Sequence, residues 1–480
     1  MNSRDGVLAG SSRTEPEPGR SGREPSRGAG LRALWERVIS PLVAMPGEHG
    51  FGFDRRWLTA WFAAFAVYAA LMTAFGIGGE DGVWGIWATC GYTLAAILAY
   101  RSRGLAVPLL VAFGFAMVGP TLWLAVRDPA TADVIVVSRS AVLLLHHGSP
   151  YLPVSQLANW TSYNPYLPAM ALFGLPSAAG FPGLLGDPRP WLTAATVVLA
   201  AAAFWVGTPH RGSRCRDCRG AAWWFAVFAV ASPLLALPLS VGITDPPVTA
   251  LTCLALAFVA RSRRMPVAAG LTIGVACAMK ATAWPALAVI AALLVARDGP
   301  RTAARFVVAA AVTGAGLVAA TAPALLTKPS ALLQNTVLFP LGLTQHKTPA
   351  ASPLPGHVLA SFGHAGHTAA VGLLAAAGLA VAVSLVIRPP ADVPAAARRL
   401  AIGLGLMFAL APAARFGYFA YPLALLAWSA LTGADRAPAR DQRAEPATSR
   451  AQPAPSRAEP APSAPVPGEQ PAPAAKPTAT

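Results

Sequence analysis

The sequence predicts an all-α polytopic membrane protein with about twelve transmembrane helices. Its residues are 55% hydrophobic and only 12% charged, whereas soluble domains carry about 25% charged residues. Several apolar runs reach the roughly 20 residues that a helix needs to cross a bilayer. The net charge of +16 comes mainly from arginines in the short segments between these runs. Because this pattern is typical of the positive-inside rule, we do not expect a nucleic-acid partner.

Apolar runs and arginine clusters together predict the topology. We predict helices near residues 57–77, 82–100, 105–126, 191–207, 221–240, 246–260, 266–279, 281–296, 305–326, 367–387, 400–414 and 416–433. All arginine clusters then face the cytoplasm only if both termini are cytoplasmic and the apolar stretch 164–186 does not cross the cell membrane. Its four prolines suit a broken or re-entrant segment, which is tolerated where protein or a water-filled cavity covers the backbone.

Composition divides the chain into three parts. Residues 1–50 and 434–480 are rich in Pro, Ala, Gly, Arg and Glu and lack apolar periodicity. Such segments bury too little apolar surface to offset the entropy of ordering, so we predict two disordered cytoplasmic tails. Residues 51–433 are predicted to form the membrane-embedded domain. The N-terminus lacks the pattern of a cleaved signal peptide, so we expect the first span to remain.

The predicted topology places three polar segments at the outer face. These are residues 127–190, the turn 242–245 and the loop 327–366. They bring five ionisable side chains to the same side of the membrane: Asp133, Asp245, His346, Lys347 and His357. The sequence therefore predicts that the chemistry of the protein takes place at this face.

Asp133 stands at the start of an amphipathic segment. The apolar residues after it recur at helical spacing, which predicts a helix lying on the membrane surface. Gly148 and Pro150 form a stop signal for that helix. The position of Asp133 suits an N-cap, and a carboxylate beside the bilayer also suits chemistry on lipid-linked substrates. Residue spacing leaves both roles open.

Several motifs resemble a known enzyme family. Asp133, the following helix, Gly148-Ser149-Pro150-Tyr151 and the YNPYLP run at 163–168 resemble the first outer loop of polyprenyl-phosphate-mannose-dependent α-mannosyltransferases (glycosyltransferase family 87, GT-C class). Three further stretches are similar to the actinobacterial branch of that family: GITDPP at 242–247, LGLTQHKTPAASPLPGH at 341–357 and APAARFGY at 411–418. Their order along the chain is a stronger signal than any one of them. The family's D-F-x-V-Y pattern is replaced by Asp133-Val134-Ile135-Val136-Val137, which leaves the sugar specificity open.

The resemblance implies a GT-C-like fold whose outer loops form a cavity. It also implies a polyprenyl-phosphate hexose as donor, with mannose as the sugar, and a lipid or glycan acceptor among the membrane lipids. We expect no cofactor and no metal. Asp133 is then predicted to be the general base that takes the acceptor's hydroxyl proton. One carboxylate suffices for inversion, because the lipid phosphate is already a good leaving group, whereas glycoside hydrolases need two carboxyl groups.

The departing phosphate needs positive charge, and we predict His346, Lys347 and Arg415 for this role. The loop with His346 and Lys347 also suits contact with lipid headgroups, and Arg415 suits snorkelling to the interface. Lys280 fits either an acidic or phosphate partner or a snorkelling turn lysine, the latter being favoured.

Six residues are predicted to contact substrate: Tyr151, Tyr163, Asn164, Tyr166, Asp245 and His357. For the tyrosines the alternative is an aromatic belt at the interface, and for Asp245 it is capping of the next helix. Cys215 and Cys218 lack the second pair of a zinc site, so no metal is predicted there. Two rival functions remain, a transporter or flippase of lipid-linked sugars and a non-catalytic scaffold for envelope assembly.

Overall fold

The computed structural model describes most of the membrane domain. The described residues are 55–76, 79–101, 104, 106–127, 131–207, 227, 230–326 and 329–433. The two predicted tails and the Cys215–Cys218 motif lie outside the described residues.

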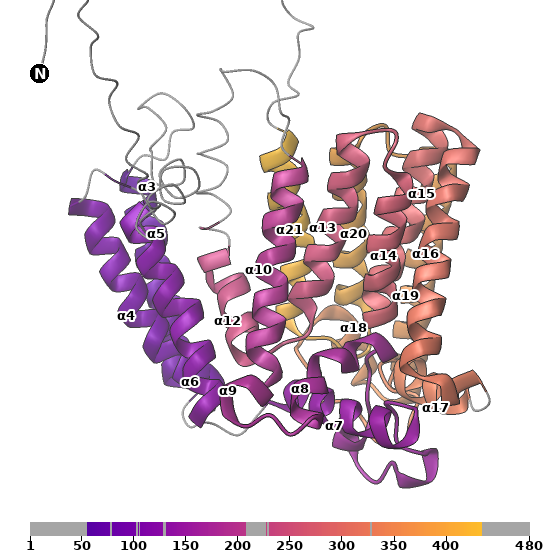
Figure 1. Ribbon diagram of the computed structural model, residues 1–480, viewed down its shortest axis with the longest axis horizontal. Coiled ribbons are helices and arrows are strands. Elements are labelled where there is room, and N and C mark those ends of the chain that lie inside the picture. Colours follow the sequence, from indigo (N-terminus) through magenta and orange to yellow (C-terminus); the bar gives the residue numbers. More distant parts are fainter. Residues whose placement is uncertain are drawn as a thin grey trace, which may run out of the picture. The chain divides into compact units, whose positions relative to one another are not determined.

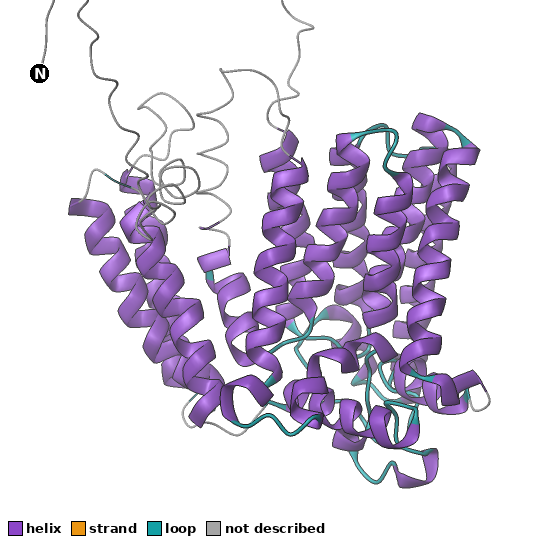
Figure 2. Ribbon diagram, in the orientation of Figure 1, coloured by secondary structure: helices purple, strands orange, loops and turns teal. Residues whose placement is uncertain are grey.

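All regular structure in the described ranges is helical (Figures 1 and 2). The longer helices are α3 (Arg55–Phe75), α4 (Glu80–Arg101), α5 (Ala106–Phe113), α6 (Gly119–Arg127), α7 (Ala132–His147), α10 (Pro188–Gly207), α12 (Pro233–Val241), α13 (Asp245–Arg261), α14 (Pro266–Met279), α15 (Trp284–Asp298), α16 (Pro300–Thr321), α19 (His364–Ile387), α20 (Val393–Leu410) and α21 (Ala420–Gly433). A short helix, α18 (Pro355–Ala360), precedes α19.

Within the described ranges, eight helical runs are long and apolar enough to cross a membrane. They are Arg56–Phe75, Glu80–Arg101, Ala106–Arg127, Pro188–Gly207, Ala281–Asp298, Pro300–Thr321, His364–Ile387 and Val393–Leu410. The prediction of an all-α polytopic membrane protein is therefore confirmed. The count of twelve stays a prediction, because α13, α14 and α21 are shorter, with 17, 14 and 14 residues.

Successive long helices run in opposite directions, so the bundle has two distinct ends (Figure 1). We call the end that carries α7, drawn at the bottom of Figure 1, the α7 end. The opposite end carries Arg261, Arg263 and Arg297, and we call it the arginine end. The first residues of α4, α10, α13 and α15 all lie at the α7 end (Figure 1).

The described helices pack around two hydrophobic cores. The larger core joins α13, α14, α15, α16, α20 and α21 with part of α7. The smaller core joins α3, α4, α5 and α12 around Trp84 and Tyr92. A π-helical turn at Gly114–Val118 links α5 to α6, and Trp84 Nε1 donates a 2.7 Å hydrogen bond to the Ala116 carbonyl there. The indole thus contacts backbone that the π turn displaces from regular α-helical geometry.

The apolar stretch 164–186 stays at the α7 end (Figure 1). It forms a 3₁₀ helix at Pro168–Gly174 and two single turns, α8 (Leu175–Ala178) and α9 (Gly183–Gly186). Each of these is too short to cross a bilayer. The segment is therefore broken into short turns, as its prolines predict, and that it does not cross the membrane stays a prediction.

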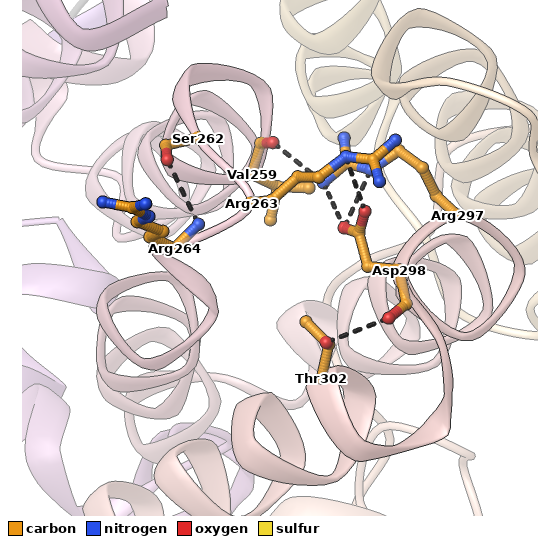
Figure 3. Close-up of polar contacts among 7 residues, drawn as sticks. All are labelled: Val259, Ser262, Arg263, Arg264, Arg297, Asp298 and Thr302. Atoms are coloured by element: carbon orange, nitrogen blue, oxygen red, sulfur yellow. Dashed lines mark hydrogen bonds and ion pairs between the residues drawn. The ribbon is translucent and has the colours of Figure 1, made fainter.

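At the arginine end, Asp298 connects the turn between α13 and α14 to the turn between α15 and α16 (Figure 3). Its carboxylate accepts two hydrogen bonds from Arg297, at 2.9 and 2.7 Å, and lies 3.2 Å from Arg263 Nε. Arg297 also donates to the Val259 carbonyl, and Thr302 donates to the Asp298 carbonyl. This end is a local network of neighbouring turns.

Candidate active site

The N-cap of α7 is Thr131. Its hydroxyl accepts a 3.3 Å hydrogen bond from the Val134 amide and donates one of 3.1 Å to the Val241 carbonyl. At the other end, Gly148 adopts a left-handed conformation with φ +63°. The prediction that Asp133 suits the N-cap is therefore wrong by two residues. Asp133 lies in the first helical turn, where the helix dipole favours a carboxylate and its side chain is available for other contacts.

The turn at 242–245 packs directly against the start of α7. Gly242 has φ +83°, and a Cβ there would lie 2.5 Å from Val134 Cγ2 and 2.8 Å from Arg189 Cγ. Only glycine fits both this conformation and this close approach. The packing places Asp245, the first residue of α13, beside Asp133.

Asp245 is held inside the protein by residues from distant segments. It forms an ion pair with Lys280, and Tyr421 donates a 2.7 Å hydrogen bond to the same carboxylate oxygen. Thr244 precedes α13 without a side-chain cap, and the Asp245 side chain is only 9% exposed. The capping alternative for Asp245 is therefore wrong, and so is the favoured snorkelling interpretation of Lys280, whose side chain is 13% exposed.

Tyr166 connects this ion pair to Asp133. Its hydroxyl takes part in side-chain hydrogen bonds with Asp133 and Thr244. Lys280 Nζ lies 5.3 Å from the centre of the Tyr166 ring and 5.7 Å from that of Tyr418, and it reaches Thr244 Oγ1 at 3.4 Å. Asp133 and Asp245 thus belong to one polar network around a single lysine.

The environment of Asp133 raises its pKa above the ordinary value. Burial is the largest cause, and the neighbouring Asp245 charge adds to it. Lys280, a hydrogen bond from Tyr166 and the charge of Arg415 all lower the pKa of Asp133 and offset part of this effect. A carboxylate of raised pKa holds a proton more readily, as a general base requires.

The segment that carries Tyr166 is fixed by Asn164, which is 3% exposed. Its side-chain amide donates to Ser140 Oγ at 2.9 Å and its Oδ1 accepts from the Tyr166 amide at 3.0 Å. Its backbone amide donates to Asn335 Oδ1 at 2.7 Å. The described contacts of Asn164 are therefore with protein, and they orient Tyr166.

All three predicted substrate tyrosines are buried, and Tyr151 and Tyr163 contact other parts of the loop region. The Tyr163 ring stacks on Phe339 at 4.3 Å and is 2% exposed. Tyr151 is 4% exposed and donates a 2.7 Å hydrogen bond to the Tyr166 carbonyl. Neither ring lies at an exposed aromatic belt or presents an open face to a sugar, so both support the loop in this structure.

Arg139, on α7, fastens the loop before Tyr163 to the helix. Its guanidinium donates to the carbonyls of Thr161, Ser162 and Tyr163 at 2.6, 3.1 and 3.2 Å. The sequence analysis did not single out this residue. A fixed loop keeps the Tyr166 hydroxyl in place beside Asp133.

The two later motifs lie against each other at the same end. Ala351 and Ala414 form an isolated parallel bridge, Ser352 Oγ accepts from the Phe416 amide at 3.2 Å, and His357 Nδ1 is 2.9 Å from the Pro412 carbonyl. The loop with the predicted phosphate residues is thereby tied to the segment containing Arg415.

The three predicted phosphate residues differ in their burial and in their relation to the network. Arg415 is half-buried and near enough for its charge to act on Asp133. The His346 ring lies 6.3 Å from the Tyr163 ring, and Lys347 is exposed. Among the described residues, no group of three His, Cys, Asp or Glu side chains is arranged to hold a metal ion.

Sequence reasoning missed Thr244, Tyr418 and Tyr421 as members of the network. Lys280 carried a usable signal, because an ionisable residue between two apolar runs is a functional candidate. Its partner could not be read from the sequence, since Asp245 lies 35 residues earlier and Tyr421 lies 141 residues later. These residues meet only when α13, α14 and α21 pack together.

Sequence comparison assigns this architecture to a class of enzymes. The profile of glycosyltransferase family 87 matches residues 166–412, slightly more than half of the chain. Comparisons with curated proteins and with solved structures gave no match. Asp133 and Arg415 lie outside the matched range, whereas Tyr166, Asp245 and Lys280 lie within it.

The fold and the match together define a multi-pass membrane glycosyltransferase, an enzyme that moves a sugar from a donor to an acceptor. The chain belongs to glycosyltransferase family 87. The predicted family is thus confirmed, whereas the actinobacterial branch stays a prediction.

Proposed function

We propose that this enzyme transfers a hexose, mannose by the resemblance, from a polyprenyl-phosphate sugar to a lipid or glycan acceptor, with inversion at the anomeric carbon. The reaction takes place at the α7 end, which is the outer face of the cell membrane. Residues 51–433 form the catalytic domain, and the tails at 1–50 and 434–480 are cytoplasmic. The observation that carries the proposal is a partly buried carboxylate, Asp133, inside a polar network at that end.

Asp133 acts as the general base in this scheme. It takes the proton of the acceptor hydroxyl as that oxygen bonds to the anomeric carbon. The bond between the anomeric carbon and the phosphate oxygen breaks, and polyprenyl phosphate leaves with the electron pair. Because attack and departure occur on opposite faces of the sugar, one base gives inversion.

Asp245 is unsuited to the role of base. Its Oδ1 binds both the Lys280 ammonium and the Tyr421 hydroxyl, so the negative charge of this carboxylate is already balanced by a cation and a hydrogen-bond donor. Asp133 is more exposed and faces only one tyrosine donor among its described side-chain hydrogen bonds. We therefore propose that Asp245 supports the substrate site indirectly.

The departing phosphate is stabilised by cations at the same end of the bundle. Of the three candidates, Arg415 is the one whose charge acts on Asp133, and His346 and Lys347 come from the loop bridged to its segment. Positive groups fixed where negative charge develops lower the barrier without reorganising. His357, held through Nδ1 by the Pro412 carbonyl, offers its other ring nitrogen to substrate.

The orientation follows from the distribution of arginine. Arg261, Arg263, Arg264, Arg297 and Arg301 gather at the arginine end, and cationic loops remain cytoplasmic during insertion. The α7 end then faces outward, where a lipid-linked donor rather than a nucleotide sugar is the available substrate.

Purified protein in nanodiscs tests this proposal with radiolabelled polyprenyl-phosphate mannose and membrane lipid extract as acceptor. We expect release of polyprenyl phosphate and label in an acceptor product, and no transfer from GDP-mannose. Labelled donor that crosses a vesicle membrane chemically unchanged supports the transporter instead. Absence of both transfer and movement with mannose, glucose and other hexose donors supports the scaffold.

A further inference from the structure

We propose that Lys280, held by Asp245, is an electrostatic support for Asp133 and acts on transfer through that carboxylate rather than by contact with the donor phosphate. This inference rests on the proposed function, because it takes Asp133 as the base. It assigns Lys280 and Asp245 the role of positioning residues.

The backbone around Lys280 is fixed from two sides. The Lys280 amide donates to the Ala276 carbonyl at 3.1 Å, and the Lys280 carbonyl accepts from Ala283 at 3.1 Å. One residue earlier, the Met279 carbonyl accepts a 2.9 Å hydrogen bond from Leu167, the residue after Tyr166. The break between α14 and α15 is thus tied to the segment that carries Tyr166, so Lys280 and Tyr166 keep their relative position.

The ammonium group lies inside the network and not in bulk water. Lys280 Nζ contacts Asp245 and Thr244, and it lies above the rings of Tyr166 and Tyr418. With the side chain only 13% exposed, its charge is weakly screened and acts strongly on a nearby carboxylate. Tyr166 and Thr244 join this charge to Asp133 through hydrogen bonds.

Every element packed around Asp133 contributes groups to its environment. Tyr166 comes from the outer loop, Asp245 from α13, Lys280 from the turn after α14, and Arg415 and Tyr418 from the segment before α21. On α10, Arg189 packs beside Gly242 and pairs with Asp187. On α7 itself, Arg139 points to the carbonyls of 161–163, and His146 and His147 lie at the exposed far end. Lys280 is the strongest favourable charge on Asp133 among these groups.

Asp245 prevents Lys280 from pairing directly with Asp133. A base locked in a tight ion pair accepts a proton poorly, because its pKa falls. The Asp245 carboxylate binds the Lys280 ammonium and also accepts a hydrogen bond from the Tyr421 hydroxyl. Lys280 is thereby kept close enough to favour the ionised form of Asp133. The two residues therefore have opposite effects on the same carboxylate.

The test compares pH profiles of kcat/KM for the wild type, Lys280→Met, Lys280→Arg and Asp245→Asn in nanodiscs, with polyprenyl-phosphate mannose as donor. The acid limb of the profile is the rise in kcat/KM as Asp133 loses its proton. Lys280→Met removes the cation and moves this limb to higher pH by about 1 to 3 pH units. Lys280→Arg restores most of the wild-type profile. Asp245→Asn moves the limb downward and lowers the plateau rate. The control Arg301→Met, an exposed charge at the arginine end, leaves the profile unchanged.

Two results would overturn the inference. A Lys280→Met variant that raises KM for the donor with an unshifted acid limb makes Lys280 a direct phosphate ligand. An equal loss of rate at every pH makes it only structural. If Lys280→Met does not fold, the double variant Lys280→Gln/Asp245→Asn replaces the ion pair by a neutral amide pair, and it too must move the limb upward.

A spectroscopic measurement separates this inference from the proposed function. Infrared spectra at neutral pH should show the C=O stretch of a protonated carboxyl group more strongly in Lys280→Gln/Asp245→Asn, which lacks the Asp245 carboxyl, than in Asp245→Asn. The band must disappear when Asp133→Asn is added to the double variant. Its absence from the double variant overturns the inference even if transfer is observed. Its presence in a protein that transfers no sugar confirms only that Lys280 favours the ionised form of Asp133, and it rejects the proposed function together with the role of Lys280 in transfer.

Discussion

Each end of the bundle contains an aspartate bound by a cation, and the two pairs are built differently. At the arginine end, Asp298 is paired with its sequence neighbour Arg297 and with Arg263, whose side chain is 74% exposed. At the α7 end, Asp245 is bound by Lys280 and Tyr421 from two other helical segments, and all of its partners are largely buried. Beside it stands a second carboxylate, Asp133, of raised pKa.

The difference distinguishes an ion pair that connects neighbouring turns from a cluster that is typical of a functional site. The Asp298 carboxylate is itself buried, but its partner Arg263 is exposed. An ion pair with an exposed partner contributes little to stability, because water and salt screen it and long side chains lose entropy. A buried pair that also borders a second carboxylate is costly to build, since each ion loses its hydration. Such a cluster is typical of a functional site, and only the α7 end contains one among the described residues.

The largest expected effect comes from Asp133→Asn. Loss of a general base typically reduces the rate by about 10²–10⁴-fold. The variant should fold normally, because Thr131 and not Asp133 caps α7. Release of polyprenyl phosphate and thermal unfolding in detergent measure the two quantities.

Thr131→Ala is the matched control for that variant. It removes the cap and should cost about 1 kcal/mol of stability while the variant retains transfer within a few-fold. If Asp133→Asn keeps the wild-type rate, Asp133 is not the general base, and the functional difference between the two ends is contradicted.

The second effect concerns stability. Asp245→Asn leaves the buried Lys280 without its ionic partner, and breaking a buried pair from one side costs about 3–5 kcal/mol. Thermal unfolding of Asp245→Asn against the wild type checks this. An unchanged unfolding temperature would show that water reaches Lys280 freely, contrary to its burial.

A third prediction sharpens the role of Tyr166. Asp133 must be ionised to accept a proton, so kcat/KM should rise with pH through the pKa of Asp133, which burial places above that of an ordinary aspartate. Tyr166→Phe removes a hydrogen bond that favours the ionised form. A bond to a charged group contributes about 1.5–3 kcal/mol, so the acid limb should move upward by about 1–2 pH units.

The control for Tyr166→Phe is Thr282→Val. Thr282 lies in the same region and hydrogen-bonds to the Tyr421 hydroxyl at 3.0 Å. Its removal should leave the acid limb in place. A limb that moves equally in both variants would mean that any loosening of the region, and not the bond to Asp133, controls the titration.

The smallest effect is expected at the arginine end. Arg263→Ala removes a largely exposed partner of Asp298, and such pairs contribute about 0–1 kcal/mol. Transfer should be unchanged and the unfolding temperature nearly so. A loss of activity comparable with that of Asp133→Asn would show that the two ends are functionally coupled.

Much of the fold could be predicted because it depends on local properties. Apolar run length predicted the long helices, and the prolines of 164–186 predicted a segment that is broken into short turns. Helix ends were less accurate: α20 starts at Val393, where Asp392 caps it through a 2.7 Å bond to the Ala395 amide, and not near residue 400. Arg398 and Arg399 lie inside this helix, because arginine is compatible with helical structure and its charge is misleading as a loop signal.

The site could be predicted only in part, for a physical reason. Motif positions identified Asp133, Tyr166, Asp245 and Arg415, which the structure brings to one end. Contacts between distant segments decided the roles that sequence left open: Tyr421 and Lys280 bind Asp245, and Thr131 replaces Asp133 as the cap. Tyr151 and Tyr163 were predicted to contact sugar, and only packing against other loops shows them to be buried.

The position of bound donor tests the central claim most directly. A cryo-electron microscopy map of the Asp133→Asn variant in nanodiscs with polyprenyl-phosphate mannose would locate the phosphate. Our account predicts phosphate density at the α7 end, in contact with Arg415, His346 or Lys347, and an anomeric carbon facing position 133. Density at the arginine end, or a sugar separated from position 133 by a protein wall, would contradict it.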